Sequence, residues 1–275
     1  MIVNPLKYLK HAKMTHFAIG HFNIGNLESA ISTIIAAEEK NSPIFLAITD
    51  KTFSYLGLEF NKTIIEIAKN SAVPIILHYD HGNNFKTAKR CLLDGYKSIM
   101  FDGSSLNYNN NIRLSRKYCQ TAHLHGASCE LELGHVSGLT KQNMFTNPEK
   151  IIDFCEKTKN DTLAISIGNT HGMPEKNEKI DFDLLKKINK ITKVPLVYHG
   201  ASSTPIKNIK ELIKHGISKI NIDTDLRISF TNGLEQYLKN HPDEIDYRKI
   251  LGFASLKVKK NVEYKIDIFG SANRA

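Results

Sequence analysis

The chain repeats one pattern eight times: a short apolar run rich in β-branched residues, then a segment with helical periodicity. The repeats recur at roughly 30 residues, the length of one strand-and-helix unit. Strands that alternate with helices build a parallel sheet, so the pattern predicts an α/β fold. Eight such units fit a closed (β/α)8 TIM barrel. An open, doubly wound sheet is the less favoured alternative, because no G-x-G-x-x-G sequence opens the first strand-to-helix turn.

The pattern sets the expected element positions along the chain. We predict strands over residues 17–23, 42–49, 73–80, 98–102, 128–133, 163–168, 195–199 and 220–224. We predict helices over residues 27–40, 60–70, 85–94, 111–125, 148–157, 182–191, 206–215 and 226–238. Residues 247–275 should add one or two helices that pack on the barrel as a short C-terminal extension. We therefore expect residues 1–275 to form a single domain.

The charge of the chain favours a small anionic substrate over a nucleic acid. The net charge is +9, from 37 basic and 28 acidic residues. The lysines are scattered over the predicted helices, however, and only Lys257, Lys259 and Lys260 form a tight cluster. A binder of nucleic acid usually gathers its basic residues on one face.

The cysteines and the apolar residues point to a cytoplasmic protein. The four cysteines, at positions 91, 119, 129 and 155, show no C-x-x-C spacing and lie in apolar surroundings, as reduced core thiols do. No run of about 18 apolar residues could span a membrane. Residues 1–14 carry charges and lack the apolar core of a signal peptide.

The third predicted strand ends in an unusual polar sequence. Its apolar run, residues 73–77, leads into His78-Tyr79-Asp80-His81-Gly82. A carboxylate is costly to bury without a partner. Asp80 and His81 could supply an acid/base and a metal ligand side by side. The alternative is a polar strand end that is hydrogen-bonded into a loop.

Further polar residues follow the other predicted strands. The carboxyl ends of barrel strands meet at one rim, where active sites lie. His81, His171 and His199 each stand beside a glycine at such an end, and three histidines with an open position are typical of catalytic zinc. The remaining polar residues at strand ends are Asn23, Asp102, Glu130, Glu132, Asn221, Asp223 and Thr224.

The connections after strands seven and eight are candidates for binding phosphate. They read Gly200-Ala201-Ser202-Ser203 and Asn221-Ile222-Asp223-Thr224, and each leads into a helix. Barrels often bind phosphate there, through backbone N–H groups and a helix N-terminus. The alternative is plain N-capping of the helices by Ser203 and Thr224. Both can hold at once.

Taken together, these motifs resemble the class II, zinc-dependent ketose-bisphosphate aldolases. They occur in the order of that family over nearly the whole chain. The matching pieces are His78-Tyr-Asp-His-Gly, Phe101-Asp-Gly-Ser, Glu130-Leu-Glu-Leu-Gly, Ile167-Gly-Asn-Thr-His-Gly, Tyr198-His-Gly-Ala-Ser, Lys219-Ile-Asn-Ile-Asp-Thr-Asp-Leu-Arg and Phe269-Gly-Ser-Ala-Asn.

The resemblance implies a role for each of these residues. The three histidines would bind one Zn²⁺, with Glu132 near an alternative metal position. Asp80 would move the proton of the substrate's C4 hydroxyl. The residues expected to bind a phosphorylated sugar are Asn23, Gly172, Gly200, Ala201, Ser202, Asn221, Ile222, Asp223, Thr224 and Arg227. The resemblance also implies a homodimer or homotetramer and allows a monovalent cation.

The resemblance leaves the substrate and the activity open. Asp223 and Arg227 favour fructose 1,6-bisphosphate, with tagatose 1,6-bisphosphate as the alternative. No lysine ends a predicted strand, which argues against a Schiff-base aldolase; Lys51 is the nearest. A zinc-binding barrel that has lost aldol chemistry and serves as a binding protein is the second class of function.

Four segments depart from the family pattern. Residues 137–140 read Ser-Gly-Leu-Thr where Gly-Gly-Glu-Glu/Asp is usual, and residues 173–176 replace a usual Tyr-Lys pair. Residues 49–51 read Thr-Asp-Lys where Ser-Glu-Gly is usual, and Ser203 replaces a glycine. Because Leu139 and Thr140 cannot carry a proton as a carboxylate does, we expect slower turnover than in relatives.

Overall fold

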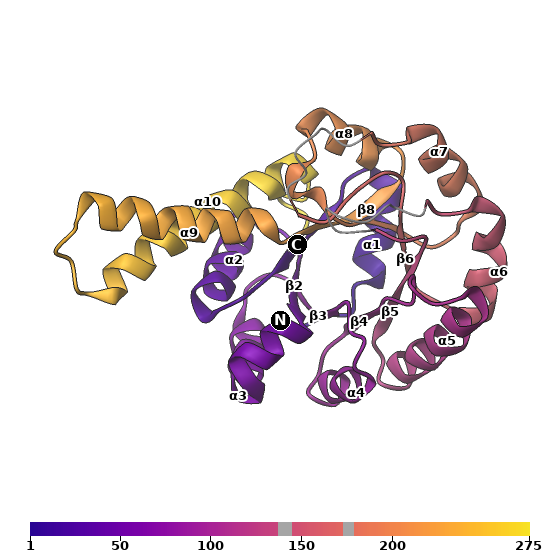
Figure 1. The fold of residues 1–275 in the computed structure, drawn as a ribbon, viewed down its shortest axis with the longest axis horizontal. Helices are drawn as coiled ribbons and strands as arrows, with labels where there is room; N and C mark the ends of the chain where they lie inside the picture. Colours follow the sequence, from indigo (N-terminus) through magenta and orange to yellow (C-terminus); the bar gives the residue numbers. More distant parts are fainter. Residues whose placement is uncertain (137–144, 173–178) are drawn as a thin grey trace.

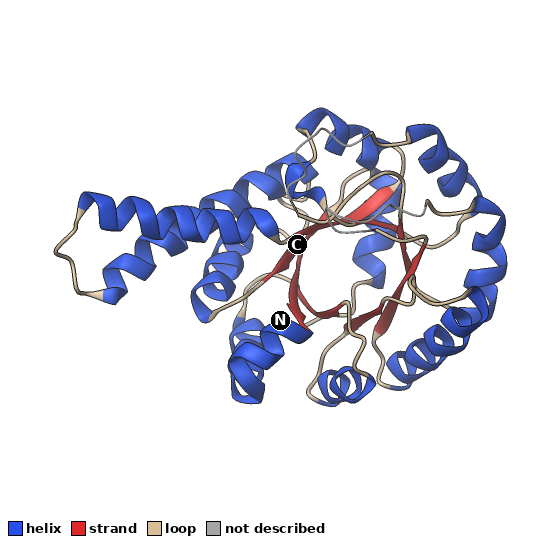
Figure 2. Ribbon diagram, viewed as in Figure 1, coloured by secondary structure: helices blue, strands red, loops and turns tan. Residues whose placement is uncertain are grey.

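The barrel predicted from the repeats is confirmed. The computed structural model describes residues 1–136, 145–172 and 179–275, without the side chains of Leu58 and Ser203. Within these residues eight parallel strands close into a barrel, each beside the next and β8 beside β1, with helices outside the strands (Figures 1 and 2). The strands are β1 Ile19–Asn23, β2 Ile44–Thr49, β3 Ile75–Asp80, β4 Ser98–Phe101, β5 Ser128–Leu133, β6 Thr162–Ile165, β7 Leu196–Tyr198 and β8 Ile217–Ile222.

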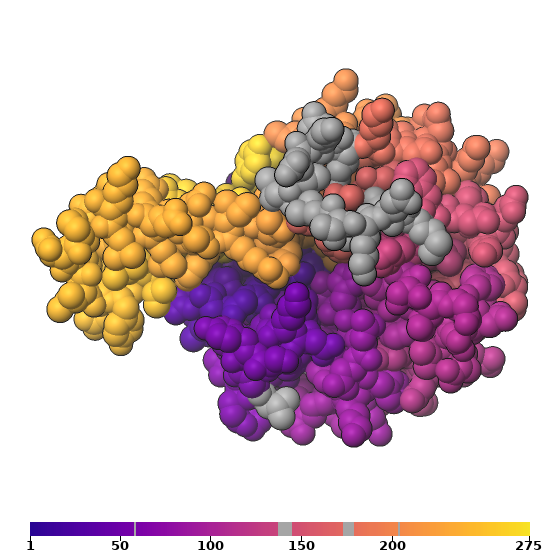
Figure 3. Space-filling view, viewed as in Figure 1, coloured from indigo at the N-terminus to yellow at the C-terminus, as the bar shows by residue number. Residues whose placement is uncertain are grey.

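The helices surround the barrel and extend beyond it on one side. They are α1 Leu6–Thr15, α2 Leu27–Glu39, α3 Asp50–Asn70, α4 Phe85–Leu93, α5 Tyr108–Leu124, α6 Pro148–Thr158, α7 Phe182–Ile191, α8 Ile206–Lys214, α9 Thr224–Asn240 and α10 Tyr247–Phe269, with the 3₁₀ turn η1 at Ala201–Ser203. The predicted C-terminal extension is α10, which packs along α9 and α2. The α9–α10 pair forms an arm that projects from the body of the molecule (Figure 3). No helix in the described part of the chain is long and apolar enough to cross a membrane.

Helix α1 was missed from the sequence, and it closes the N-terminal end of the barrel. Its Leu9 and Ala12 pack in one buried cluster with Ile19, Phe45 and Ile76, which lie near the starts of β1, β2 and β3. The opposite end, where the strands finish, is therefore the open one.

Two of the boundaries predicted from the sequence were wrong in ways that matter for the site. Strand β8 begins at Ile217 rather than at residue 220, which places Lys219 inside the barrel. Helix α3 begins at Asp50 rather than at residue 60, because Thr49 caps it through the backbone N–H of Thr52. The left-handed backbone of Gly57 (φ 75°) interrupts the helical pattern there, which hid the first part of the helix from sequence analysis.

The alternation of side chains along each strand decides what enters the barrel. Residues i and i+2 of a strand share one face. Outward residues such as Leu77 and Tyr79 belong to the apolar layer between strands and helices. The inward residues change along β3 from Ile76 through His78 to Asp80. The barrel interior is thus apolar near α1 and polar toward the open end.

Candidate active site

The open end of the barrel holds a cavity of about 430 Å³. Twelve of the sixteen lining residues were predicted from the sequence as site residues. The lining residues are Asn23, Thr49, Lys51, Asp80, His81, Asp102, Val136, His171, Gly172, His199, Gly200, Ser202, Asn221, Asp223, Thr224 and Arg227. Three predicted residues, Glu132, Ala201 and Ile222, have fully buried side chains outside this lining. Sequence analysis missed Thr49 and Lys51 as site residues, although both lie at the end of a predicted strand.

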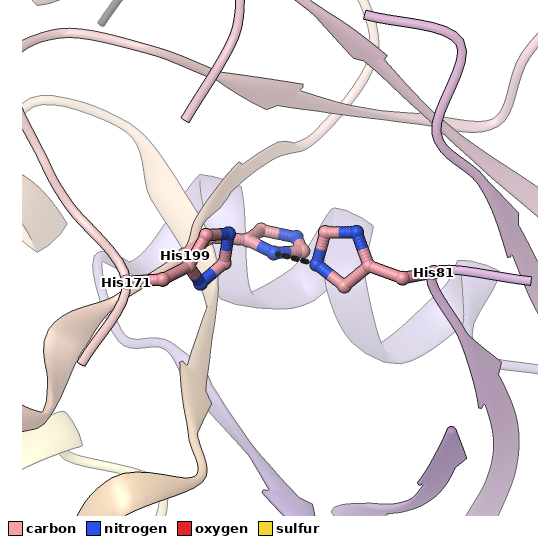
Figure 4. A group of neighbouring side chains, drawn as sticks. All are labelled: His81, His171 and His199. Carbon is pink, nitrogen blue, oxygen red and sulfur yellow. Dashed lines mark hydrogen bonds between the residues drawn. The ribbon is translucent and has the colours of Figure 1, made fainter. Parts of the chain in front are cut away.

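Three histidines from separate connections converge in this cavity. His81 follows β3, His171 follows β6 and His199 follows β7, and one ring nitrogen of each lies within 4.8 Å of the others. Nε2 of His81 is 3.1 Å from Nδ1 of His199, and Figure 4 shows the three rings facing a common point. His81 has a left-handed backbone (φ 46°), a conformation that costs roughly 1–3 kcal/mol in a residue other than glycine. This donor set suits a catalytic Zn²⁺ or a similar divalent metal.

Carboxylates contact two of these rings on the side away from the common point. Nδ1 of His81 is 3.2 Å from Oδ2 of Asp102, and Nε2 of His199 is 3.0 Å from Oε1 of Glu130. In both rings the nitrogen opposite the carboxylate faces the common point. Histidines that bind metals are usually oriented in this way. Sequence analysis placed Asp102 and Glu130 at strand ends and gave neither a role.

The surroundings set the charge of each imidazole. Burial lowers the pKa of His81, but the carboxylates of Asp80 and Asp102 outweigh it and raise that pKa to about 10. Burial, with the neighbouring His81, lowers the pKa of His171 to about 3, so this ring is neutral and free to bind a metal. Burial also lowers the pKa of His199.

A buried lysine accompanies Glu130. Nζ of Lys219 is 2.7 Å and 3.0 Å from the two carboxylate oxygens of Glu130, and both side chains are shielded from solvent. The pair lowers the pKa of Glu130 although burial alone would raise it. Lys219 is therefore held as a partner of Glu130 rather than presented to the cavity.

Asp80 lies beside the histidines and is almost fully buried. Its Oδ2 accepts a hydrogen bond from Nδ2 of Asn23 at 2.9 Å, and Nε2 of His21 is 3.6 Å from the same oxygen. Burial would raise the pKa of Asp80, but the neighbouring imidazoles of His81 and His21 lower it well below its ordinary value. The carboxyl group is thus ionised and available as a base.

Glu132 lies near His81 and Asp102 and is fully buried. Its Oε1 accepts from the backbone N–H of Val136 at 3.0 Å, and its Oε2 has no partner among the described residues. Burial, followed by the neighbouring charge of Asp102, raises its pKa to about 8. Ligand atoms of Glu132, Asp102 and His81 lie within 4.8 Å of one another, which makes a second group able to hold a cation.

The packing of the predicted phosphate-binding loops depends on the backbone of one glycine. Gly200 has a left-handed backbone (φ 73°), and a Cβ there would lie 1.9 Å from the carbonyl oxygen of Thr170. Only glycine therefore allows the loops after β6 and β7 to pack together. Capping by Thr224, the alternative to a phosphate site, does not occur, because Asp223 occupies the N-cap position and Oγ of Ser202 accepts from the N–H of Asp225. Capping by Ser203, the other part of that alternative, depends on a side chain that the structure does not describe.

Asp223 and Arg227 stand at the cavity edge as a pair. Nη2 of Arg227 is 2.6 Å from Oδ2 of Asp223. Burial raises the pKa of Asp223, partly offset by Arg227. The segments 137–140 and 173–176, which depart from the family pattern, lie outside the described residues, so the expectation about Leu139 and Thr140 stays a prediction.

Comparisons with known proteins agree on one family. Residues 3–274 match the family described as "Fructose-bisphosphate aldolase class-II". The fructose-bisphosphate aldolase of Thermus caldophilus is 34% identical, with all of both chains covered. The sulfofructosephosphate aldolase of Alkalicoccus urumqiensis is 34% identical over 97% of this chain and 96% of the relative. The crystal structure of the YdjI aldolase from Escherichia coli K12 has a TM-score of 0.91 at 31% identity, again over the full length of both.

Proposed function

We propose that this chain, which belongs to the class II fructose-bisphosphate aldolase family, cleaves fructose 1,6-bisphosphate to dihydroxyacetone phosphate and glyceraldehyde 3-phosphate with the help of zinc. The observation that carries this proposal is the convergence of His81, His171 and His199 beside the ionised Asp80 at the open end of the barrel. We further propose that residues 1–275 act as one domain.

The histidines supply the metal site in this proposal. His81, His171 and His199 would hold Zn²⁺, oriented by Asp102 and Glu130. When bound, the ion acts as a Lewis acid that stabilises the negative charge formed as C3–C4 breaks. The second group, with Glu132, offers another position for the ion at the same histidine, His81.

Asp80 is the proton-transfer residue in this proposal. Cleavage removes the proton from the C4 hydroxyl, and the reverse reaction returns it. The carboxylate of Asp80 is ionised and lies at the cavity wall, so it accepts this proton through one oxygen. The hydrogen bond from Asn23 keeps the other oxygen in place.

The loops after β6, β7 and β8 would bind the dihydroxyacetone phosphate half. Gly172, Gly200, Ser202, Asn221 and Thr224 line the cavity on that side, close to the N-terminus of α9. Backbone N–H groups at a helix N-terminus suit a phosphate. The buried Ala201 and Ile222 would contribute only their backbone.

Asp223 and Arg227 would face the distal half of the sugar in this arrangement. Arg227 is 66% exposed at its side chain, which leaves donors free for a second anionic group beyond its contact with Asp223. We propose fructose 1,6-bisphosphate as the substrate on this basis, and the relatives named for that substrate support the proposal.

Turnover on two sugars tests the proposal. The purified protein is given fructose 1,6-bisphosphate or tagatose 1,6-bisphosphate, and release of triose phosphate is followed through a coupled dehydrogenase. We expect faster turnover of the fructose compound, loss of activity with EDTA and recovery with Zn²⁺. Asp80→Asn is the inactive control. Bound zinc without turnover of either sugar would instead support a binding protein.

A further inference from the structure

A chain of hydrogen-bonding groups leads from Asp80 into the barrel interior. Nδ2 of Asn23 is 2.9 Å from Oδ2 of Asp80, and Oδ1 of the same amide is 3.1 Å from Nε2 of His21. His21 and Asp80 are both almost completely buried. Nε2 of His21 is 3.6 Å from Asp80 itself, beyond hydrogen-bonding distance, so the contact between them runs through Asn23.

The chemistry of these groups fixes the direction of each hydrogen bond. The NH₂ group of Asn23 lies at Oδ2 of Asp80 and can only donate, so the carboxylate accepts. The carbonyl oxygen of Asn23 then faces His21, and an oxygen needs a donor. Nε2 of His21 must therefore carry the hydrogen. Burial lowers the pKa of His21, so the ring is neutral and Nδ1 carries no hydrogen. Nδ1 has no hydrogen-bond partner among the described residues, so no contact there favours the tautomer with its hydrogen on Nδ1.

We propose that His21 is a positioning residue for the proton transfer at Asp80. By donating from Nε2 to Oδ1 of Asn23, it locks the amide in the one orientation that donates to Oδ2 of Asp80. Without this donor the amide is free to rotate by half a turn, which would place its carbonyl oxygen against the carboxylate. The locked amide holds the carboxylate of Asp80 in place at the cavity wall.

Packing alone does not account for a histidine at this position. The His21 ring stacks with Phe45 at 6.2 Å between ring centroids and meets the edge of His78 at 5.1 Å. An apolar side chain of similar size would fill the same space. Such a side chain could not donate a hydrogen bond to Oδ1 of Asn23, as Nε2 of His21 does. A buried amide oxygen without a donor costs about 1–3 kcal/mol.

The first test compares two replacements of similar size. His21→Gln can place an amide NH₂ near the position of Nε2, whereas His21→Met cannot donate. Because small misplacements of a catalytic group can cost up to about 100-fold in rate, we expect His21→Met to lower kcat by about 10- to 100-fold. KM and the zinc content should change by less than about twofold, and His21→Gln should restore kcat to within about threefold. Equal losses in both variants would overturn the proposal.

A double-mutant cycle with Asn23→Ala tests whether His21 acts through Asn23. In the Asn23→Ala background, His21→Met should lower kcat by less than about twofold more, since the amide it orients is absent. Multiplicative losses would show that His21 acts by another route. If the Met variant does not fold, His21→Asn replaces it, because its shorter amide places no donor at the position of Nε2.

A second measurement does not depend on turnover. The proposal rests on the proposed aldolase function for the role of Asp80, but the tautomer of His21 can be read directly. In ¹⁵N-histidine NMR of the zinc-loaded protein, the signal that disappears in His21→Gln should show the hydrogen on Nε2, and Asn23→Ala should shift it toward a mixture. Hydrogen on Nδ1 in the wild type would refute the positioning role, whereas failure of the sugar assay alone would refute the aldolase function.

Discussion

Nζ of Lys219 lies 2.7 Å from Oε2 of Glu130 in the interior of the barrel, where neither side chain reaches solvent. Glu130 in turn contacts Nε2 of His199, so the ion pair stands directly behind a candidate metal ligand. A buried charge pair of this kind is costly to break, because removing one partner leaves the other charge alone.

The first prediction follows from this ion pair. Lys219→Met should lower the free energy of unfolding by about 3–5 kcal/mol, because Glu130 loses its buried counter-charge. Urea unfolding of the metal-free protein measures this loss. Lys214→Met, at an exposed surface pair with Glu211, is the control and should change stability by less than about 1 kcal/mol. The prediction is wrong if both variants lose stability equally.

The second prediction concerns the metal. His199→Ala removes one of three converging ligands, so we expect loss of bound zinc and of aldolase activity together. Zinc content by elemental analysis and turnover of fructose 1,6-bisphosphate are the measurements. His11→Ala, an exposed histidine far from the cavity, should keep both. Activity that survives EDTA, or a lysine adduct trapped by borohydride, would contradict the metal-dependent mechanism.

The third prediction concerns the role of Asp80. Asp80→Asn keeps the shape of the side chain but removes the basic oxygen, so kcat should fall by about 10²–10⁴-fold. The zinc content should stay the same, because the three histidines are unchanged. If zinc is lost with activity, Asp80 supports the metal site instead of moving the proton.

The fourth prediction concerns the choice of sugar. The wild type should prefer fructose 1,6-bisphosphate to its C4 epimer, tagatose 1,6-bisphosphate. Asp223→Ala removes a polar contact at the cavity edge and should narrow this preference by about 1–3 kcal/mol in kcat/KM. Asp243→Ala, at the exposed turn between α9 and α10, should leave the preference as it is. A wild type that prefers tagatose 1,6-bisphosphate refutes the assignment.

The fifth prediction concerns stability in acid. Burial, with the nearby Lys219, lowers the pKa of His78 well below 6.5, so this ring stays neutral in the folded protein. The unfolded chain takes up a proton there as the pH falls below about 6.5, and stability is lost by up to about 1.4 kcal/mol per pH unit for this residue.

Urea unfolding at pH 7.5 and pH 5.5, without metal, measures this loss. Between the two pH values His78→Asn should lose less stability than the wild type, by up to about 1–1.5 kcal/mol, since Asn does not titrate. The same substitution at His123, a more exposed histidine that pairs with Asp161, is the control and should reduce the loss less. Equal acid sensitivity of wild type and His78→Asn would contradict the prediction.

The sequence by itself determined the barrel and the rim on which the cavity lies. Strand and helix periodicity are local properties, and eight repeats of strand and helix leave few closed arrangements. Because parallel strands share one direction, polar residues at their ends had to meet at one rim. The proximity of His81, His171 and His199 therefore followed from their positions after strands three, six and seven.

Only the tertiary structure decided which polar groups inside the barrel contact one another. Lys219 and Glu130 are far apart in the chain, and their pairing depends on the register and stagger of the closed sheet. The same holds for Asp102 behind His81 and for Asn23 beside Asp80. Local sequence patterns do not predict such contacts, because each contact depends on backbone positions set by strands that are distant in the chain. The cap of α9 by Ser202 was missed for the same reason, whereas the start of α3 was missed because Gly57 interrupts the helical pattern.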